Sequence, residues 1–173
     1  MDVFPLALAF VLRPDVEGGL VDDPHDPGDR TNLGITEGTL RDARLLMDAL
    51  PATVEALTRA DAERIYRLLY WKRAHCDEMP DALALFTFDS AVQHDPRDAV
   101  RFVQRALKLN ADGDFGPKTK AAVAAVKNWS ATLQVVFARR VHHYMLLDKL
   151  DDRYGFGWAL RVARAYDTAK GLL

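Results

Sequence analysis

The sequence predicts a mostly helical protein with one small non-helical region near its N-terminal end. Apolar residues recur at helical spacing through most of the 173 residues, and 49% of all residues are hydrophobic, enough to build a core. Residues 17–36 interrupt this pattern, because they hold four of the ten glycines and two of the eight prolines. The apolar pieces Leu20-Val21 and Leu33-Gly34-Ile35 flank an Asp/Pro/Gly-rich centre, which favours a small hairpin or structured loop there.

The helices are predicted in chain order from apolar spacing, capping residues and prolines. The first covers Phe4 to Leu12 and leads into the interrupted region. The later ones are expected over these segments: from Thr36 to about Ala49, Thr58 to Trp71, Ala82 to Gln93, onward from Pro96, onward from Pro117, Ser130 to Leu147, and onward from Gly155. The segment from Ala82 to Gln93 is the most apolar, so we expect it to be the central buried helix.

Charge and cysteine content exclude several classes of protein. The formal net charge is −2 with both signs mixed along the chain, which argues against a nucleic-acid partner. A single cysteine, Cys76, excludes an intramolecular disulfide framework. Phe4 to Leu12 lacks a basic segment before it and is too short to span a bilayer. We therefore expect a monomer made in the cytoplasm, with no signal peptide and no stable membrane insertion.

The glycine-rich region carries residues suited to cleaving a glycosidic bond. That reaction needs a carboxylic acid to protonate the leaving oxygen and a second group to handle the water or the sugar cation. Glu17 ends an apolar segment and precedes Gly18-Gly19, which leave space around its carboxyl group. Asp26 is the candidate second carboxylate, with Asp22 and Asp23 as alternatives. The plain alternative is a loop whose aspartates only form turns with their own backbone.

The motifs in this region extend into a family resemblance. The run from Glu17 to Thr36, with EGG, DDP, DPG and TNLGIT in that order, resembles the signature of glycoside hydrolase family 108. Further matching segments are Tyr70-Trp71, Phe88 to Gln93, and Asp112 to Thr119, so the resemblance covers most of the chain. The family consists of bacterial and phage N-acetylmuramidases. It implies an all-α, lysozyme-like fold with a small hairpin or loop lobe over the catalytic cleft.

The resemblance also implies roles for individual residues. Glu17 corresponds to the proton donor, and Asp26 with Thr31 would position or activate water, as in inverting enzymes. The implied substrate bond is the β-1,4 linkage between N-acetylmuramic acid and N-acetylglucosamine of peptidoglycan, cleaved without a cofactor or metal. The implied setting is phage or prophage lysis, in which the enzyme reaches the cell wall after holin-dependent release. Residues 1–93 would be the catalytic region, and residues 94–173 a peptidoglycan-binding segment packed into the same globular protein.

Several positions depart from the family pattern. Pro14 falls three residues before Glu17, where the family continues its first helix, and a proline there would kink or restart that helix. Leu20 replaces an aromatic residue, and Asp29 stands where a glycine is common. His94-Asp95-Pro96 replaces a glycine-containing turn. The first departure bears on the placement of Glu17, and the others bear on the walls of the substrate site.

Four further residues are candidates for binding the substrate. Asn32 offers an amide beside Thr31, and Trp71 offers a ring for stacking on a sugar. Asp89 and Gln93 are one helical turn apart and would present polar groups from the central helix. Four basic residues of the C-terminal half would add attraction to an anionic wall: Lys118, Lys120, Arg139 and Arg140.

Two other functions compete with a glycosidase. The chain would be a non-catalytic peptidoglycan-binding module if only the segment Asp112 to Thr119 matters. It would be an amidase or peptidase of the stem peptides if it held zinc or a Cys/His pair. Cys76 and His75 are adjacent and point in different directions, and the Asp-rich loop lacks calcium-loop spacing. Residues 110–121 also lack the closing glutamate of a calcium loop, so we predict a turn there.

Overall fold

The computed structural model describes residues 2–17, 20–21, 30–146 and 155–173. Its chain forms two compact units. The N-terminal unit is Phe4–Leu69, and the helical unit is Tyr70–Leu173 together with the first residues of the chain. Helices dominate both units, and the strands that the structure describes are short, so the predicted all-α, lysozyme-like fold class is confirmed.

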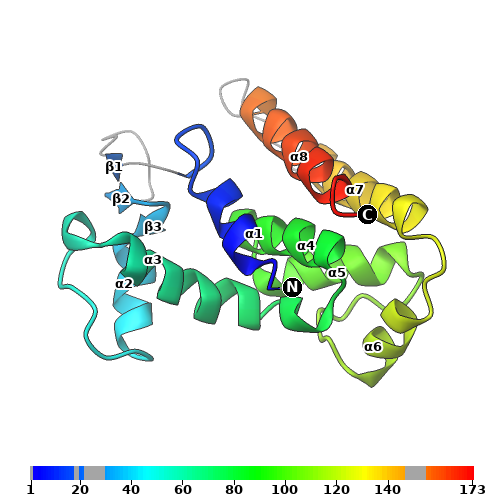
Figure 1. Cartoon of the computed structure of the whole chain (residues 1–173), viewed down its shortest axis with the longest axis horizontal. Coiled ribbons are helices and arrows are strands. Elements are labelled where there is room, and N and C mark those ends of the chain that lie inside the picture. Colours follow the sequence, from blue (N-terminus) through cyan, green and yellow to red (C-terminus); the bar gives the residue numbers. More distant parts are fainter. Residues whose placement is uncertain (1, 18–19, 22–29, 147–154) are drawn as a thin grey trace. The chain divides into compact units, whose positions relative to one another are not determined.

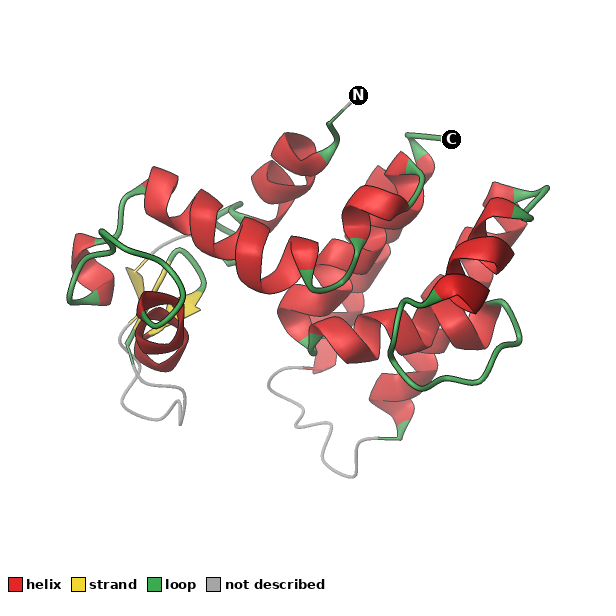
Figure 2. Ribbon diagram, turned by 90° about the horizontal axis from the view of Figure 1, so that it is seen from below, coloured by secondary structure: helices red, strands yellow, loops and turns green. Residues whose placement is uncertain are grey.

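The N-terminal unit combines three helices with a small sheet (Figure 2). Helix α1 covers Phe4–Val11, α2 covers Glu37–Arg44 and α3 covers Arg59–Tyr66, and a short 3₁₀ helix covers Val54–Ala56. The strands are β1 (Leu20–Val21), β2 (Thr31–Asn32) and β3 (Ile35–Thr36). They form an antiparallel sheet in the order β1-β2-β3, with Val21 opposite Thr31 and Thr31 opposite Thr36. Short paired strands are therefore present where the sequence predicts a small hairpin or structured loop, but β1 pairs with Thr31–Asn32, and Leu33-Gly34 forms a turn.

A two-residue turn, Leu33-Gly34, connects β2 to β3. Both residues have a positive φ, 52° at Leu33 and 71° at Gly34. Positive φ at both central positions is the conformation that matches the twist of a tight hairpin. Glycine adopts it at no cost, whereas leucine adopts it only where the surroundings hold it. This turn lies against residues of the candidate site described below.

Local capping fixes where the helices of the N-terminal unit begin. The Thr36 hydroxyl accepts from the Thr39 N–H at 3.1 Å and starts α2. Thr58 and Asp61 form the predicted capping box at the start of α3. Helix α2 ends at Arg44, earlier than predicted, because the chain after it turns tightly back onto the last carbonyl groups of the helix. Beyond α3, residues Arg67–Lys72 continue as a π-helix.

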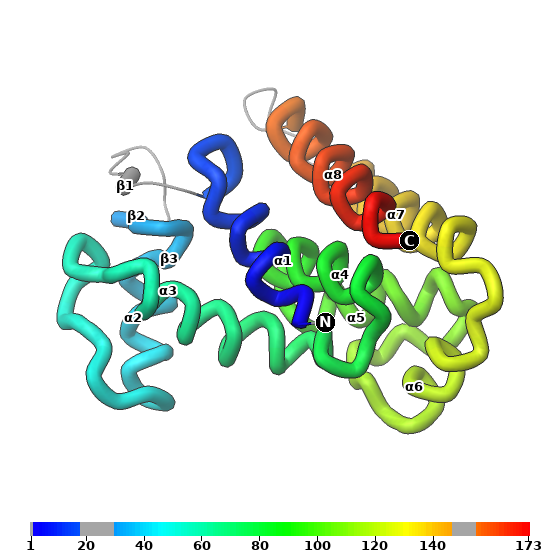
Figure 3. Tube along the Cα trace, viewed as in Figure 1, coloured from blue at the N-terminus to red at the C-terminus, as the bar shows by residue number. Residues whose placement is uncertain are grey.

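The helical unit is built around helix α4, Asp81–Gln93 (Figure 1). Every residue of α4 from Ala82 to Ala91 is buried, as its continuous apolar sequence predicts. Helices α5 (Pro96–Ala106), α7 (Trp129–Met145) and α8 (Gly155–Lys170) pack against α4, and α7 also packs against α5 and α8. Figure 3 shows α7 and α8 running side by side. A 3₁₀ helix (Cys76–Glu78) precedes α4, and α6 (Pro117–Ala124) follows α5.

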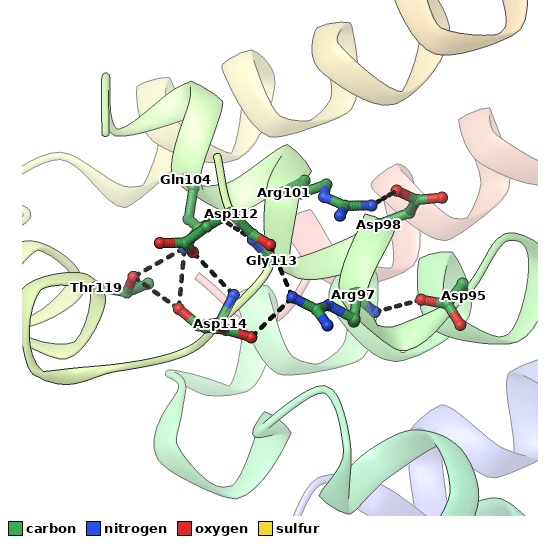
Figure 4. Close-up of polar contacts among 9 residues, drawn as sticks. All are labelled: Asp95, Arg97, Asp98, Arg101, Gln104, Asp112, Gly113, Asp114 and Thr119. Carbon is green, nitrogen blue, oxygen red and sulfur yellow. Dashed lines mark hydrogen bonds and ion pairs between the residues drawn. The ribbon is translucent and has the colours of Figure 1, made fainter. Parts of the chain in front are cut away.

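The segment Asp112 to Pro117 is a turn bonded to α5 (Figure 4). The buried Gln104 amide donates to Asp112 Oδ1 at 2.8 Å and to the Asp114 carbonyl at 3.0 Å, and its oxygen accepts from the Gly113 N–H at 2.9 Å. Hydrogen bonds to the Asp112 carboxylate, first from the Asp114 N–H and then from Gln104, lower the pKa of that carboxyl group. These hydrogen bonds hold the turn against α5. The predicted turn is therefore confirmed.

The chain divides into its two compact units between Leu69 and Tyr70, whereas the sequence suggests a functional division into residues 1–93 and 94–173. The division into a catalytic region and a peptidoglycan-binding segment stays a prediction. Among the helices of residues 2–17, 30–146 and 155–173, none combines the length and apolar composition needed to cross a membrane.

Candidate active site

Glu17 lies at the end of a turn that folds back onto helix α1. The helix ends at Val11, and the Glu17 N–H donates to the Val11 carbonyl at 3.1 Å. Pro14 falls inside this turn, so the helix ends before the proline, which neither kinks nor restarts it. Arg13 and Asp15 pair their side chains across the turn at 3.0 Å. The backbone of Glu17 is therefore held at the end of a buried helix, and its side chain is half-buried.

The Leu33-Gly34 turn contacts Glu17 directly. A methyl group on Gly34 would lie 2.6 Å from Cβ of Glu17 and 2.4 Å from the hydroxyl oxygen of Tyr66. The Tyr66 hydroxyl donates to the Leu33 carbonyl at 3.0 Å, and Tyr66 itself is buried. The bare Cα of Gly34 therefore lets the turn, the start of the Glu17 side chain and the Tyr66 hydroxyl meet at one point. This contact joins the two ends of the motif that runs from Glu17 to Thr36.

Of the other predicted site residues in this unit, Thr31 and Asn32 form the central strand β2. Thr31 is half-buried and belongs to the hairpin whose turn contacts Glu17. The Asn32 amide nitrogen donates to the Val54 carbonyl at 2.8 Å, which ties the strand to the 3₁₀ helix Val54–Ala56. Asp26, with its alternatives Asp22 and Asp23, lies outside the described residues. The structure therefore places Glu17 and the Thr31 hairpin together, and it leaves the position of the second carboxylate a prediction.

Replacing Gly34 by alanine should destabilise the N-terminal unit and impair the site. The new methyl group would collide with Glu17 and Tyr66, and alanine disfavours the φ of 71°. We expect the free energy of unfolding to fall by about 2–4 kcal/mol, together with the activity. Gly38→Ala is the matched control, because its nearest neighbours are 3.7 Å away and it lies in helix α2. That variant should gain about 0.5–1 kcal/mol in chemical unfolding, and equal losses in both variants would contradict this account.

Asp89 has a different environment from the one that a substrate-binding role requires. Its side chain is 1% exposed, and its two carboxylate oxygens contact Arg140 Nη1 at 2.6 Å and Arg161 Nε at 2.9 Å. Burial alone would raise the pKa of Asp89, but the two guanidinium charges outweigh burial and hold it below its usual value. Asp89 therefore joins α4 to α7 and α8 inside the helical unit, which corrects the predicted contact with substrate. Arg140 is fully buried and likewise cannot attract the wall as predicted.

Gln93 and Trp71 also take part in packing. The Gln93 amide oxygen accepts from Arg140 Nη2 at 2.9 Å, and its side chain is half-buried, so a role in binding substrate stays a prediction. Trp71 is 2% exposed, packs edge-on against Phe88 at 5.5 Å, and donates from Nε1 to Asp77. Its ring has no open face for a sugar, which corrects the stacking that we predicted.

His94, next to this cluster, should make the stability of the helical unit depend on pH. Burial, and then the charges of Arg140 and His143, lower the pKa of His94 from 6.5 to about 3. Below pH 6.5 the His94 side chain is protonated in the unfolded chain but stays neutral in the folded protein. The free energy of unfolding therefore falls as the pH falls from 6.5 toward 3. We expect a loss of about 2 kcal/mol between pH 7 and pH 5. His94→Gln should remove most of this slope in urea titrations, and an unchanged slope would contradict the assignment.

Within residues 2–17, 20–21, 30–146 and 155–173, no three side chains of His, Cys, Asp or Glu gather closely enough to hold a metal ion. The cluster of acidic residues and His25 between residues 22 and 29 lies outside this part of the chain.

Sequence reasoning missed Tyr66 and the arginine partners of Asp89. A buried tyrosine needs a hydrogen-bond partner, and a carboxylate on an apolar helix needs a counter-charge. The sequence therefore indicates that Tyr66 and Asp89 each have a polar partner. The sequence does not identify these partners, because Tyr66 bonds to a turn far away in the sequence and Arg140 comes from another helix.

Comparisons with known proteins agree with this architecture. A family model described as Glycosyl hydrolase 108 matches residues 9–94, a range that includes Glu17, the hairpin and α4. The structure is similar to one described as "Structure of Brucella abortus SagA", with a TM-score of 0.82 and 32% sequence identity. That similarity covers 98% of this chain and 92% of the other. No curated protein sequence matches the chain. On the family match and the near-complete structural similarity, the chain belongs to the glycosyl hydrolase 108 family.

Proposed function

We propose that this protein is an N-acetylmuramidase that cleaves the β-1,4 bond between N-acetylmuramic acid and N-acetylglucosamine in peptidoglycan, with Glu17 as its general acid. Membership of the family makes the chain a glycoside hydrolase and indicates peptidoglycan as its polymer. The observation that carries the assignment of Glu17 is its contact with the Leu33-Gly34 turn. Glu17 is supported as the acid because its backbone is bonded to the end of α1 and its Cβ packs against a tight turn, which limits the positions of its side chain.

The proposed reaction begins with proton transfer from the Glu17 carboxyl group to the oxygen that bridges the two sugars. The bond from that oxygen to the anomeric carbon then breaks, and positive charge develops on the sugar ring. Two contacts hold the base of the Glu17 side chain: the bond of the Glu17 N–H to Val11, and the close approach of its Cβ to Gly34. Such positioning lowers the barrier because the acid need not be ordered during the reaction.

The second half of the reaction needs a water molecule on the opposite face of the sugar. We propose that Asp26 removes a proton from this water and that the Thr31 hydroxyl orients it. Thr31 is supported by its place in the hairpin that contacts Glu17. Asn32 and Gln93 are the proposed contacts to the sugar substituents. Attack from the opposite face inverts the configuration at the anomeric carbon.

Variants of the three neighbouring aspartates test the identity of the second carboxylate. Asp26→Asn should reduce the rate of cell-wall clearing by about a hundredfold or more, because the water loses its base. Asp22→Asn and Asp23→Asn should stay within a few-fold of the wild type. Initial rates of turbidity loss on purified walls measure all three, and a large loss in Asp23→Asn with none in Asp26→Asn would reassign the role.

We also propose how the enzyme reaches and holds the cell wall. Residues 94–173 would attach the enzyme to the wall, the chain would act as a monomer, and it would reach the wall after holin-dependent release from the cytoplasm. This setting matches the lytic enzymes of phages and prophages. Gel filtration coupled to light scattering tests the monomer, and expression in bacteria with and without a holin tests the release.

The competing functions make different predictions for purified cell walls. A binding module would bind the walls without clearing them, and an amidase or peptidase would release amino groups without new reducing ends. A cysteine nucleophile is disfavoured, because Cys76 is buried and burial raises the pKa of its thiol well above the usual value. The His75 ring contacts Glu78 at 2.9 Å instead of activating the thiol. Clearing of walls with new reducing ends supports the muramidase, and binding without clearing rejects it.

A further inference from the structure

Trp129 differs from the other two tryptophans of the chain. Trp71 packs edge-on against Phe88, with ring centres 5.5 Å apart, and Trp158 stacks on Tyr144 at 5.7 Å. Trp129, the first residue of α7, has no aromatic partner among the residues that the structure describes, and its side chain is half-buried. Trp158 is half-buried as well, so what distinguishes Trp129 is that no aromatic ring of the described residues covers its indole.

Trp129 forms part of the walls of two hollows within the helical unit. They measure about 460 and 480 Å³, and both have Pro80 and Trp129 in their walls. The first is completed by the 3₁₀ helix before α4 and by α6. The second is completed by the first turn of α4, by the start of α7 with the two residues before it, and by Leu172 and Leu173. Volumes in this range fit small ligands. Trp129 and Pro80 are thus the residues that the two hollows share.

The walls combine apolar surface with hydrogen-bonding groups of both charges. In the first hollow Met79 and Val123 supply apolar surface, and the Glu78 carboxylate pairs with the Lys120 ammonium group. Hydrogen bonds from Lys120 and His75 lower the pKa of Glu78, so it stays ionised and can accept further hydrogen bonds. The second hollow adds the side chains of Asp81, Lys127, Asn128 and Ser130.

This chemistry fits a neutral sugar better than an ion. The acidic residues Asp77, Glu78 and Asp81 stand beside Lys120 and Lys127, so neither sign of charge dominates the two walls. A hexose ring has an apolar face of C–H groups and a rim of hydroxyl or amide groups. An indole can stack its apolar face, which carries a negative quadrupole, on the C–H face of the sugar. Paired charged side chains offer hydrogen-bond donors and acceptors to the hydroxyl or amide groups of the rim.

We propose that Trp129 and its two hollows form a glycan-binding subsite of the helical unit, separate from Glu17 in the N-terminal unit. The ligand is a stretch of N-acetylated glycan chain, with one sugar ring stacked on Trp129 and its substituents directed to the two hollows. The choice of the peptidoglycan strand as this chain rests on the proposed function. The subsite keeps the enzyme on its polymer between cleavage events.

Sedimentation with insoluble peptidoglycan tests the subsite in the full-length chain. Binding is measured in a Glu17→Gln background so that the walls stay intact. Trp129→Ala should weaken binding by about five- to tenfold, the range expected for the loss of one aromatic stacking contact. Trp129→Tyr keeps an aromatic face and should stay within about twofold of its parent. Phe156→Ala is the matched control, because Phe156 is an exposed aromatic of α8 outside both walls, and it should bind as the parent does.

A second variant guards against a folding defect in Trp129→Ala. Ala124 is exposed in the wall of the first hollow, so Ala124→Gln should fill that hollow without removing the indole, and it should also weaken binding. Soluble N-acetylglucosamine oligomers should displace the parent protein from the walls. Parent-like binding by both Trp129→Ala and Ala124→Gln would overturn the proposal, and so would weakened binding in Phe156→Ala to the same degree. Failure of the oligomers to compete would overturn the glycan as ligand.

Hydrolysis by Glu17 and glycan binding at Trp129 have different readouts. Turbidity loss by the wild type compared with Glu17→Gln reports hydrolysis, whereas the binding curves report the subsite. If Glu17→Gln still clears the walls, the proposed acid is wrong, and binding is then measured on ice before clearing begins. The ranking of the Trp129, Ala124 and Phe156 variants still decides the subsite.

Discussion

Glu17→Gln should lower the rate of cell-wall clearing by about a thousandfold, the middle to upper range for loss of a general acid. Glutamine has nearly the same shape as glutamate but carries no ionisable proton for the glycosidic oxygen. Glutamine keeps two contacts that hold residue 17: its N–H donates to the Val11 carbonyl, and its Cβ packs on Gly34. The variant should therefore keep its fold, bind the walls and leave them uncleared.

Glu63→Gln is the control for this experiment. Glu63 is an exposed glutamate of α3 in the same compact unit, so its replacement should change neither the fold nor the clearing rate. Circular dichroism and a thermal melt on each variant check that the fold is kept. Clearing by Glu17→Gln at more than about a tenth of the wild-type rate would remove Glu17 from the role of general acid.

Asp89→Asn should have the largest effect on stability, a loss of about 3–5 kcal/mol in the free energy of unfolding. The substitution keeps the volume of the side chain and removes its charge, which leaves the guanidinium groups of Arg140 and Arg161 together without the carboxylate between them. Arg140 is fully buried and also bonds Ser90 and Gln93, so it cannot turn toward water without breaking those bonds. Urea unfolding followed by tryptophan fluorescence measures the loss, because all three tryptophans belong to the helical unit.

Asp98→Asn provides the comparison on the surface of the same unit. Asp98 pairs with Arg101 at 2.7 Å, and both side chains remain about one-third exposed. Such a pair contributes about 0–1 kcal/mol, because water solvates both charges when they separate. If Asp89→Asn costs no more than Asp98→Asn, the carboxylate between the two arginines does not hold α4, α7 and α8 together.

Local signals in the sequence predict most of the secondary structure correctly. The Thr58–Asp61 capping box, the prolines at positions 96 and 117 and the apolar run of α4 each identify a helix that the structure contains. These signals succeed because capping, proline geometry and burial act over a few residues. Helix α2 ends earlier than predicted because a turn after Arg44 competes with the helix, and no glycine or proline marks that turn.

Contacts between distant segments were less accessible from the sequence. The motif from Glu17 to Thr36 indicates a functional region, but only the structure places Gly34 against both Glu17 and Tyr66. Asp89 and Trp71 stand in matching motif segments and were expected to bind sugar, yet both are buried. A residue can match a family motif because the fold requires it, as well as because it contacts the substrate. The motif alone therefore does not distinguish a buried ion pair from a substrate contact.

Mass spectrometry of peptidoglycan digested by the wild-type protein tests the central claim most directly, because it reports the cleaved bond and the new end group together. A muramidase releases fragments that end in a reducing N-acetylmuramic acid and retain their stem peptides, and these fragments should disappear with Glu17→Gln. Fragments that end in a reducing N-acetylglucosamine, or glycan strands separated from their peptides without new reducing ends, would contradict the account.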